Sequence, residues 1–230
     1  MRFQDHAYFE SIHNVHKGER AFVLATGPSI EHMDIGRLKG EYTVGINHLI
    51  LWKDLPFIPT AWAQSEFDGR DRVAKEVAHL DIPKWWANQN WPDFDETWKW
   101  LYKDPKVGFH QTGNSEWKWR GNDDALGLRD EFWRVANAYS PVQESAIPVL
   151  LWQGFTHIYL CGVNHTRVGH VYDEELVTTR PHTRLSASTN AYINMQTVMN
   201  EHGRTLINCT ADSEAPVPYE SLDSVLGVKV

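Results

Sequence analysis

Two short, continuously apolar runs constrain the fold of this chain more than any other feature. Residues 20–26 (RAFVLAT) and 157–163 (HIYLCGV) each meet a glycine at or just beyond their end. Unbroken apolarity, as opposed to alternation, is typical of parallel strands that are covered on both faces. Residues 41–47 and 205–210 show the same pattern more weakly. We therefore expect these four segments to be strands of a parallel sheet.

Helix-length segments separate these runs. They cover residues 68–80, 142–154 and 187–203. Alternating strands and helices predict right-handed βαβ units. The expected fold is a single α/β domain over residues 1–230, with a Rossmann-like, open, mostly parallel sheet and helices on both of its faces.

Residues 84–134 interrupt the alternation and are rich in tryptophan. We interpret them as an inserted lid subdomain over the strand ends. A tryptophan can stack on a sugar or base ring, but a cluster of them is more often a local core, and we expect core packing for most. The tryptophans are Trp85, Trp86, Trp91, Trp98, Trp100, Trp117, Trp119 and Trp133.

Composition narrows the classes of function. The formal net charge of -8 argues against a protein that binds nucleic acid through a broad positive field. No apolar run approaches the roughly 18 residues that a membrane span needs, so we expect no membrane span and a cytoplasmic location. The two cysteines, Cys161 and Cys209, are expected to be reduced and buried.

Ligands of open parallel sheets bind at the carboxyl ends of the strands. The functional loops should therefore be residues 26–30, 47–52, 64–68 and 163–172. In the first of them, a turn follows the strand, and bare amides at such a turn suit a phosphate. Its candidate residues are Thr26, Gly27, Pro28 and Ser29. An ordinary strand-to-helix turn is an equally good explanation, since neither a dinucleotide fingerprint nor a P-loop is present.

The loop after residues 157–163 is dense in hydrogen-bonding side chains. A leaving phosphate could accept hydrogen bonds from Tyr172, Thr166 and Arg167. A solvated loop of a histidine-rich protein is the alternative. The candidate residues here are Asn164, His165, Thr166, Arg167, His170 and Tyr172.

A third polar stretch, TTRPHTRLSAST at residues 178–189, precedes the last long helix. His182 could act there as a general base toward an acceptor hydroxyl, and Arg180 could hold an anion. Loops of this composition usually just face water.

Metal ligation has little support. Residues 65–71 (SEFDGRD) and 122–124 (NDD) carry carboxylates, but neither places two aspartates around one residue after a strand. We therefore expect that no cofactor is required. Mg²⁺ could still bind with few protein ligands.

Three stretches together resemble a known family. VLATGPSI, VGINH and SAIPVLLWQGFTHIYLCGVNHTRVGHVY look like the bacterial sialyltransferases of glycosyltransferase family 42. The resemblance extends to a wider group that contains flagellin-modifying motility accessory factors and archaeal 6-hydroxymethylpterin pyrophosphokinases. It covers about residues 20–65 and 140–210.

The resemblance implies roles for particular residues. It implies a nucleotide site that includes Thr26, Gly27, Ser29, Asn47 and either Gln64 or Ser65. Of the family's two tyrosines that stabilise the departing phosphate, Tyr172 matches one and Thr166 stands at the other position. His182 resembles the catalytic base, at a slightly different spacing. Asn164 replaces the family's aspartate.

The resulting hypothesis is a glycosyltransferase that moves a sugar from a nucleotide donor, with CMP as one candidate nucleotide, to a hydroxyl of a glycan or small molecule. One alternative is a Mg²⁺-dependent pyrophosphokinase acting on a pterin-like alcohol. Another is a non-catalytic protein that binds carbohydrate or nucleotide. A homo-oligomer is left open.

Overall fold

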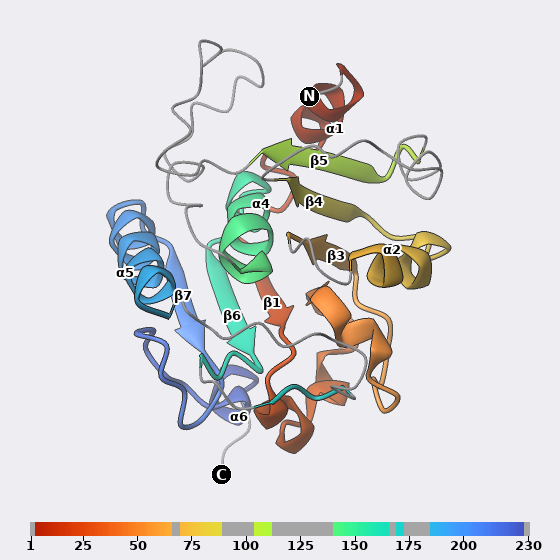
Figure 1. Cartoon of the computed structure of the whole chain (residues 1–230). Helices are drawn as coiled ribbons and strands as arrows, with labels where there is room; N and C mark the ends of the chain where they lie inside the picture. The colour runs from red at the N-terminus through yellow and green to blue at the C-terminus, as the bar shows by residue number, and fades with distance from the viewer. Residues whose placement is uncertain are drawn as a thin grey trace.

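The fold is known from a computed structural model. It describes residues 3–65, 70–88, 104–111, 140–165, 169–172 and 185–227. Its centre is a sheet of seven parallel strands in the order β5-β4-β3-β2-β1-β6-β7 (Figure 1). The predicted Rossmann-like α/β class is confirmed.

The four predicted strands are all present. They are β1 (Arg20–Leu24), β2 (Tyr42–Ile46), β6 (His157–Cys161) and β7 (Thr205–Asn208). In β1, the residues Ala21 to Leu24 are completely buried, as continuous apolarity requires of a strand covered on both faces.

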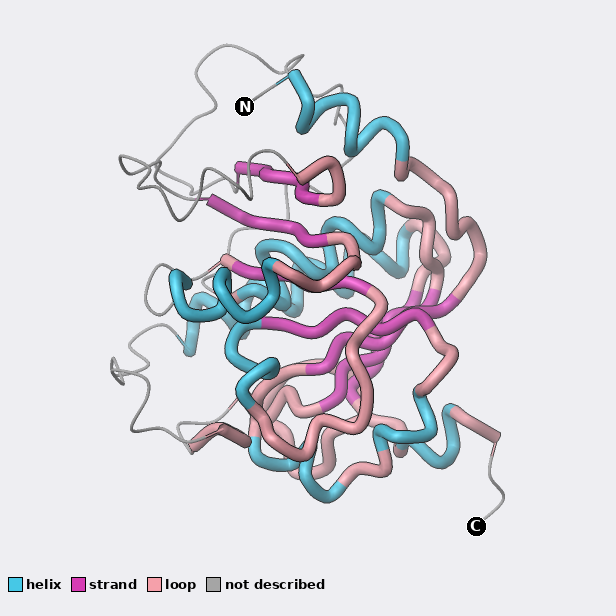
Figure 2. The backbone as a smooth tube through the Cα atoms, turned by 90° about the vertical axis from the view of Figure 1, so that its right-hand side faces the viewer, coloured by secondary structure: helices cyan, strands magenta, loops and turns pink. Residues whose placement is uncertain are grey.

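Helices and short 3₁₀ turns cover both faces of the sheet (Figure 2). The core on one face packs α4 (Ile147–Trp152), α5 (Leu185–Glu201) and α1 (Phe3–Ser11) against the strands. The core on the other face uses α2 (Arg70–Ala78), α6 (Leu222–Val225) and three 3₁₀ turns. These turns are η1 (Pro28–His32), η2 (Ile35–Leu38) and η3 (Asn47–Leu51).

The helix predicted over residues 142–154 begins as a π-helix, η6 (Val142–Ala146), before it becomes α4. Pro148 has no N–H to donate to the carbonyl of Glu144, so the preceding turn cannot close as an α-helix. One polar residue of η6 contacts the sheet, where the Ser145 hydroxyl donates to the Trp85 carbonyl at 3.4 Å.

Three strands of the sheet were not predicted. They are β3 (Ala61–Gln64), β4 (Lys84–Asn88) and β5 (Val107–Gln111). The predicted insert over residues 84–134 is therefore wrong where β4 and β5 lie, because both belong to the main sheet. Its remaining parts, residues 89–103 and 112–134, fall outside the described residues.

Trp85 and Trp86 are 0% and 4% exposed, which confirms core packing for these two. The other six tryptophans of the predicted insert lie outside the described residues. Next to them, Lys84 is fully buried, and its Nζ donates to the carbonyls of Leu80 at 2.8 Å and Ile82 at 3.0 Å. It also pairs with Asp104 at 3.2 Å, which joins the beginnings of β4 and β5.

Two further predictions can be compared with the fold. Cys161 and Cys209 are free and buried, as expected. A hydrogen bond with Cys209, together with burial, raises the pKa of the Cys161 thiol. Across the described residues, no helix is long and apolar enough to cross a membrane.

Candidate functional site

All seven strands are parallel, so their carboxyl ends meet at one edge of the sheet. The chain runs outward from β1 to β5 and then returns to the other side of β1 with β6. The connections therefore diverge between β1 and β6. This is the point at which open α/β sheets usually bind ligands.

The turn after β1 is closed by the protein itself. The Gly27 amide donates to the Gly162 carbonyl at 2.9 Å, and the Ile30 amide donates to the Gly27 carbonyl at 3.2 Å. The Ser29 amide and hydroxyl both donate to Asn164 Oδ1, at 3.3 and 2.7 Å. Pro28 has no N–H. The amides of Gly27, Ser29 and Ile30 therefore have partners within the protein. The phosphate site predicted at this turn stays a prediction.

Gly27 allows the turn after β1 to approach the loop after β6 closely. A Cβ at this position would lie 2.2 Å from Asn164 Oδ1 and 2.3 Å from the Gly162 carbonyl oxygen. The missing side chain therefore makes room for the loop after β6.

The ends of β2 and β3 are different. Asn47 is 8% exposed and Gln64 is completely buried, yet Asn47 Oδ1 and both amide atoms of Gln64 have no hydrogen-bond partner among the described residues. The hydroxyl of the neighbouring Ser65 is buried and lacks one as well. A buried polar group without a partner costs about 1–3 kcal/mol. All three residues were predicted to bind nucleotide.

Backbone geometry also distinguishes this edge. Asn47 and His165, which follow β2 and β6, both have positive φ angles, 48° and 56°. Left-handed conformations of residues other than glycine are uncommon and gather at functional sites. Among the described residues only two others, Asn14 and Asp212, share this feature.

His165 contacts the beginning of α5. Its Nε2 lies 3.1 Å from Thr189 Oγ1, and its ring meets Tyr192 edge-on at 5.6 Å between centroids. Burial raises the pKa of the Tyr192 hydroxyl, so this group stays neutral. Through these contacts the loop after β6 is joined to α5.

Residues 169–172 join the loops after β1 and β2. His170 Nδ1 lies 3.2 Å from Thr26 Oγ1, and the Val171 amide donates to the Thr26 carbonyl at 2.9 Å. The ring of Tyr172 stacks on His170 and contacts His48. The structure thus brings three predicted residues, Thr26, His170 and Tyr172, into one cluster.

Four predicted residues, Thr166, Arg167, Arg180 and His182, lie outside the described residues. The base and the cationic groups predicted from the sequence therefore stay predictions. The sequence analysis did not predict His48 as a site residue, and Thr189 entered it only as the last residue of the polar stretch 178–189. The signal for His48 was its place directly after Asn47, in a loop already predicted to be functional.

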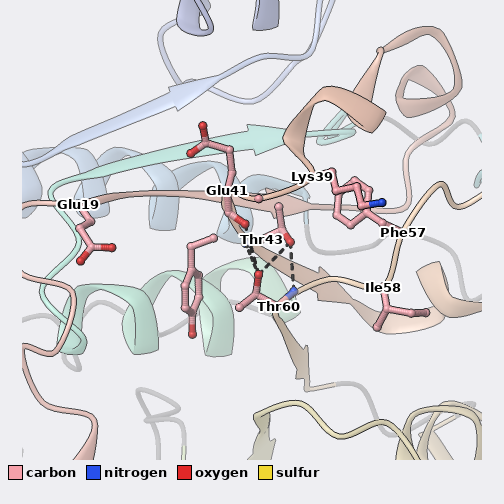
Figure 3. Close-up of a pocket in the computed structure, with 9 residues that line it drawn as sticks. Glu19, Lys39, Glu41, Thr43, Phe57, Ile58 and Thr60 are labelled. Carbon is pink, nitrogen blue, oxygen red and sulfur yellow. Dashed lines mark hydrogen bonds between the residues drawn. The ribbon is translucent and has the colours of Figure 1, made fainter.

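A shallow hollow of about 520 Å³ lies at the opposite edge of the sheet, by the amino ends of β1, β2 and β3 (Figure 3). Several of its polar groups bind one another. The Thr60 amide donates to Thr43 Oγ1 at 3.1 Å, and the Thr60 hydroxyl donates to the Glu41 carbonyl at 3.3 Å. The hollow is not part of the candidate site.

Within the described ranges, no three His, Cys, Asp or Glu side chains come together as a metal site. The polar atoms of Asn47, Gln64 and Ser65 are neutral, so this part of the edge suits hydroxyls, amides or a base ring better than a bare cation.

Comparisons with known proteins identify the fold. No family model and no curated protein matches this chain. Among solved structures, the sialyltransferase CstII from Campylobacter jejuni in complex with a substrate analogue, cytidine-5'-monophosphate, matches with a TM-score of 0.55 and 12% identity. This match covers 88% of this chain and 85% of that one.

Two further CstII structures match with a TM-score of 0.52 each. One, in complex with a trisaccharide acceptor and CMP, is 14% identical and covers 85% of this chain and 83% of its own. The other, monomeric CstII, is 13% identical and covers 87% of both chains. At this level of identity the likeness concerns architecture, so the chain shares the fold of the sialyltransferase CstII.

Proposed function

We propose that this protein is a glycosyltransferase that takes a sugar from a nucleotide donor and transfers it to a hydroxyl group. The proposal is supported by two independent facts. The fold is that of an enzyme whose structures include CMP. Polar residues also collect at the ligand-binding edge of this chain's own sheet.

One observation carries the proposal. The amide of Gln64, the oxygen of Asn47 and the hydroxyl of Ser65 are buried and have no partner among the described residues. A ligand with donors and acceptors of its own would satisfy them, and a nucleoside offers both on its base and its ribose. Since these three groups are uncharged, they suit the nucleoside part of a donor better than its phosphate.

The phosphate would then lie toward the cluster of Thr26, His170 and Tyr172. In the transfer, the acceptor oxygen forms a bond to the anomeric carbon while the bond from that carbon to the phosphate oxygen breaks. Negative charge develops on the departing phosphate, where a hydrogen bond from the Tyr172 phenol would stabilise it. A general base takes the acceptor's proton, and the resemblance assigns that role to His182.

The test begins with ligand binding. We expect CMP to raise the melting temperature of the protein more than UDP, GDP or ATP, with or without Mg²⁺. Titration calorimetry then gives the affinity for CMP. Cleavage of CMP-N-acetylneuraminate is measured through the amount of CMP that is released.

Gln64→Leu should abolish the effect of CMP while the variant stays folded. Glu31→Gln, on an exposed position of η1, is the matched control and should keep it. Stabilisation by ATP and Mg²⁺ alone, with AMP released in the presence of 6-hydroxymethylpterin, would favour the pyrophosphokinase. A wild-type protein that none of the nucleotides stabilises would contradict the proposal.

A further inference from the structure

The segment 169–172 is attached to the loop after β1 at two points, both on Thr26. The Thr26 carbonyl accepts from the Val171 amide at 2.9 Å, and its hydroxyl lies 3.2 Å from His170 Nδ1. Thr26 is itself 6% exposed and follows a fully buried strand. His170 is therefore held by a residue that the sheet fixes in place.

The ring of Tyr172 contacts two imidazoles. His170 is parallel to it, with 5.0 Å between centroids and 7° between planes. His48, on η3, contacts it at 5.3 Å and 44°. Tyr172 and His48 are 6% and 1% exposed, so neither ring has room to turn. Two different loops thus determine the plane of the phenol ring, and with it the direction of its hydroxyl.

From this geometry we infer that His170 is a positioning residue, which holds the Tyr172 phenol in place for the departing phosphate. The inference rests on the proposed function, in which Tyr172 donates that hydrogen bond. A donor stabilises developing charge best when it is already oriented, and a displacement of about 1 Å can cost about 100-fold in rate.

A histidine fits this role because it supplies two interactions at once. Its flat ring stacks on Tyr172, and Nδ1 bonds to Thr26. Phenylalanine would keep the stacking and lose the hydrogen bond, whereas alanine would lose both. The two contributions can therefore be separated by substitution.

His16 provides a matched control at the other edge of the sheet. It is also half-buried, its ring stacks on Phe155 at 4.7 Å and 17°, and its Nδ1 lies 3.1 Å from Glu19 Oε2. His16→Ala thus removes the same pair of interactions away from the candidate site.

The experiment compares His170→Ala, His170→Phe, Thr26→Val and His16→Ala. For each variant, kcat is measured for cleavage of CMP-N-acetylneuraminate at saturation, and Kd for CMP by calorimetry. We expect His170→Ala to lower kcat at least ~10-fold while Kd changes less than about threefold. His170→Phe should recover most of the rate, to within about threefold of wild type, and Thr26→Val should match it. His16→Ala should leave kcat unchanged.

Three results would overturn the positioning role. They are a wild-type kcat in His170→Ala, a loss of CMP affinity as large as the loss of kcat, or an equal loss of kcat in His16→Ala. In each of them the wild-type enzyme is active, so the proposed function stands. A wild-type protein that neither binds CMP nor cleaves the donor would overturn the proposed function and the positioning role together.

Discussion

The carboxyl ends of β1 and β6 lie on the same edge of the sheet as those of β2 and β3. The two pairs differ in whether their polar groups find hydrogen-bond partners within the described protein. Between β1 and β6, the Gly27 amide donates to the Gly162 carbonyl, and the Ser29 amide and hydroxyl donate to Asn164 Oδ1. After β2 and β3, polar atoms of Asn47 and Gln64 are buried without a partner among the described residues.

The point where the connections diverge is thus the better satisfied of the two pairs of strand ends. The first pair of strand ends is closed by interactions within the protein, which stabilise the fold whether or not a ligand is present. The second pair has groups whose desolvation only a ligand, or residues outside the described ranges, would offset. Substitutions in the two pairs should therefore change the stability of the protein in opposite directions.

The largest effect should follow from opening the closed pair. In Gly27→Ala, the new Cβ would lie 2.2 Å from Asn164 Oδ1, so the loop after β6 must move. We expect the free energy of unfolding to fall by about 3 kcal/mol, measured by urea denaturation. Gly36→Ala is the control, since its nearest neighbour would be 3.5 Å away, and it should change stability by less than about 0.5 kcal/mol. Equal stability of the two variants would show that the β1 and β6 loops are not tightly packed.

The next comparison uses two completely buried glutamines. Gln143 exchanges two hydrogen bonds with Ser188, at 2.8 and 3.0 Å, so Gln143→Leu should lower the free energy of unfolding by about 2 kcal/mol. Gln64 has no such bonds to the residues that the structure describes, so Gln64→Leu should raise the free energy of unfolding by about 1 kcal/mol while CMP binding is lost. Urea denaturation with and without CMP checks both. A destabilised Gln64→Leu would mean that Gln64 is already satisfied, and the contrast between the two strand pairs would disappear.

A smaller effect is expected at Asn164. Asn164→Ala removes the acceptor for both the amide and the hydroxyl of Ser29, which are only partly buried, and should cost about 1 kcal/mol in unfolding free energy. Asn164→Asp retains an acceptor oxygen and should remain within about 0.5 kcal/mol of the wild type. If Asn164→Ala is as stable as wild type, the hydrogen bonds between Ser29 and Asn164 contribute little to the free energy of unfolding.

The smallest change in stability at neutral pH is expected from a substitution at the opposite edge of the sheet. Burial raises the pKa of Tyr42 to about 12 from its ordinary value of 10.0. As pH rises from 10 toward 12, the unfolded state loses this proton before the folded state does, so the free energy of unfolding falls. Tyr42→Phe should weaken that alkaline loss and change stability at pH 7 by about 0.5 kcal/mol. Denaturation curves from pH 7 to 11 measure it, and an unchanged alkaline slope would contradict it.

Much of the fold could be predicted because its signals are local. Continuous apolar runs marked β1, β2, β6 and β7, and the rule for parallel sheets then placed Asn47 at the ligand-binding edge. Gln64 was named only through the family resemblance. The missing strands had no such signal. β3 is only four residues long, and β4 begins with the charged Lys84 followed by two tryptophans, which suggested an insert.

The sequence by itself determined the class of fold, the edge at which polar loops gather and the residue types available there. Tertiary structure alone decided which of these groups satisfy one another. Asn164 reaches Ser29 across 135 residues of chain, and His170 reaches Thr26 across 144. Local patterns of polarity carry no information about such pairs, because a hydrogen bond depends on distances and directions that only the packing of β1 against β6 establishes.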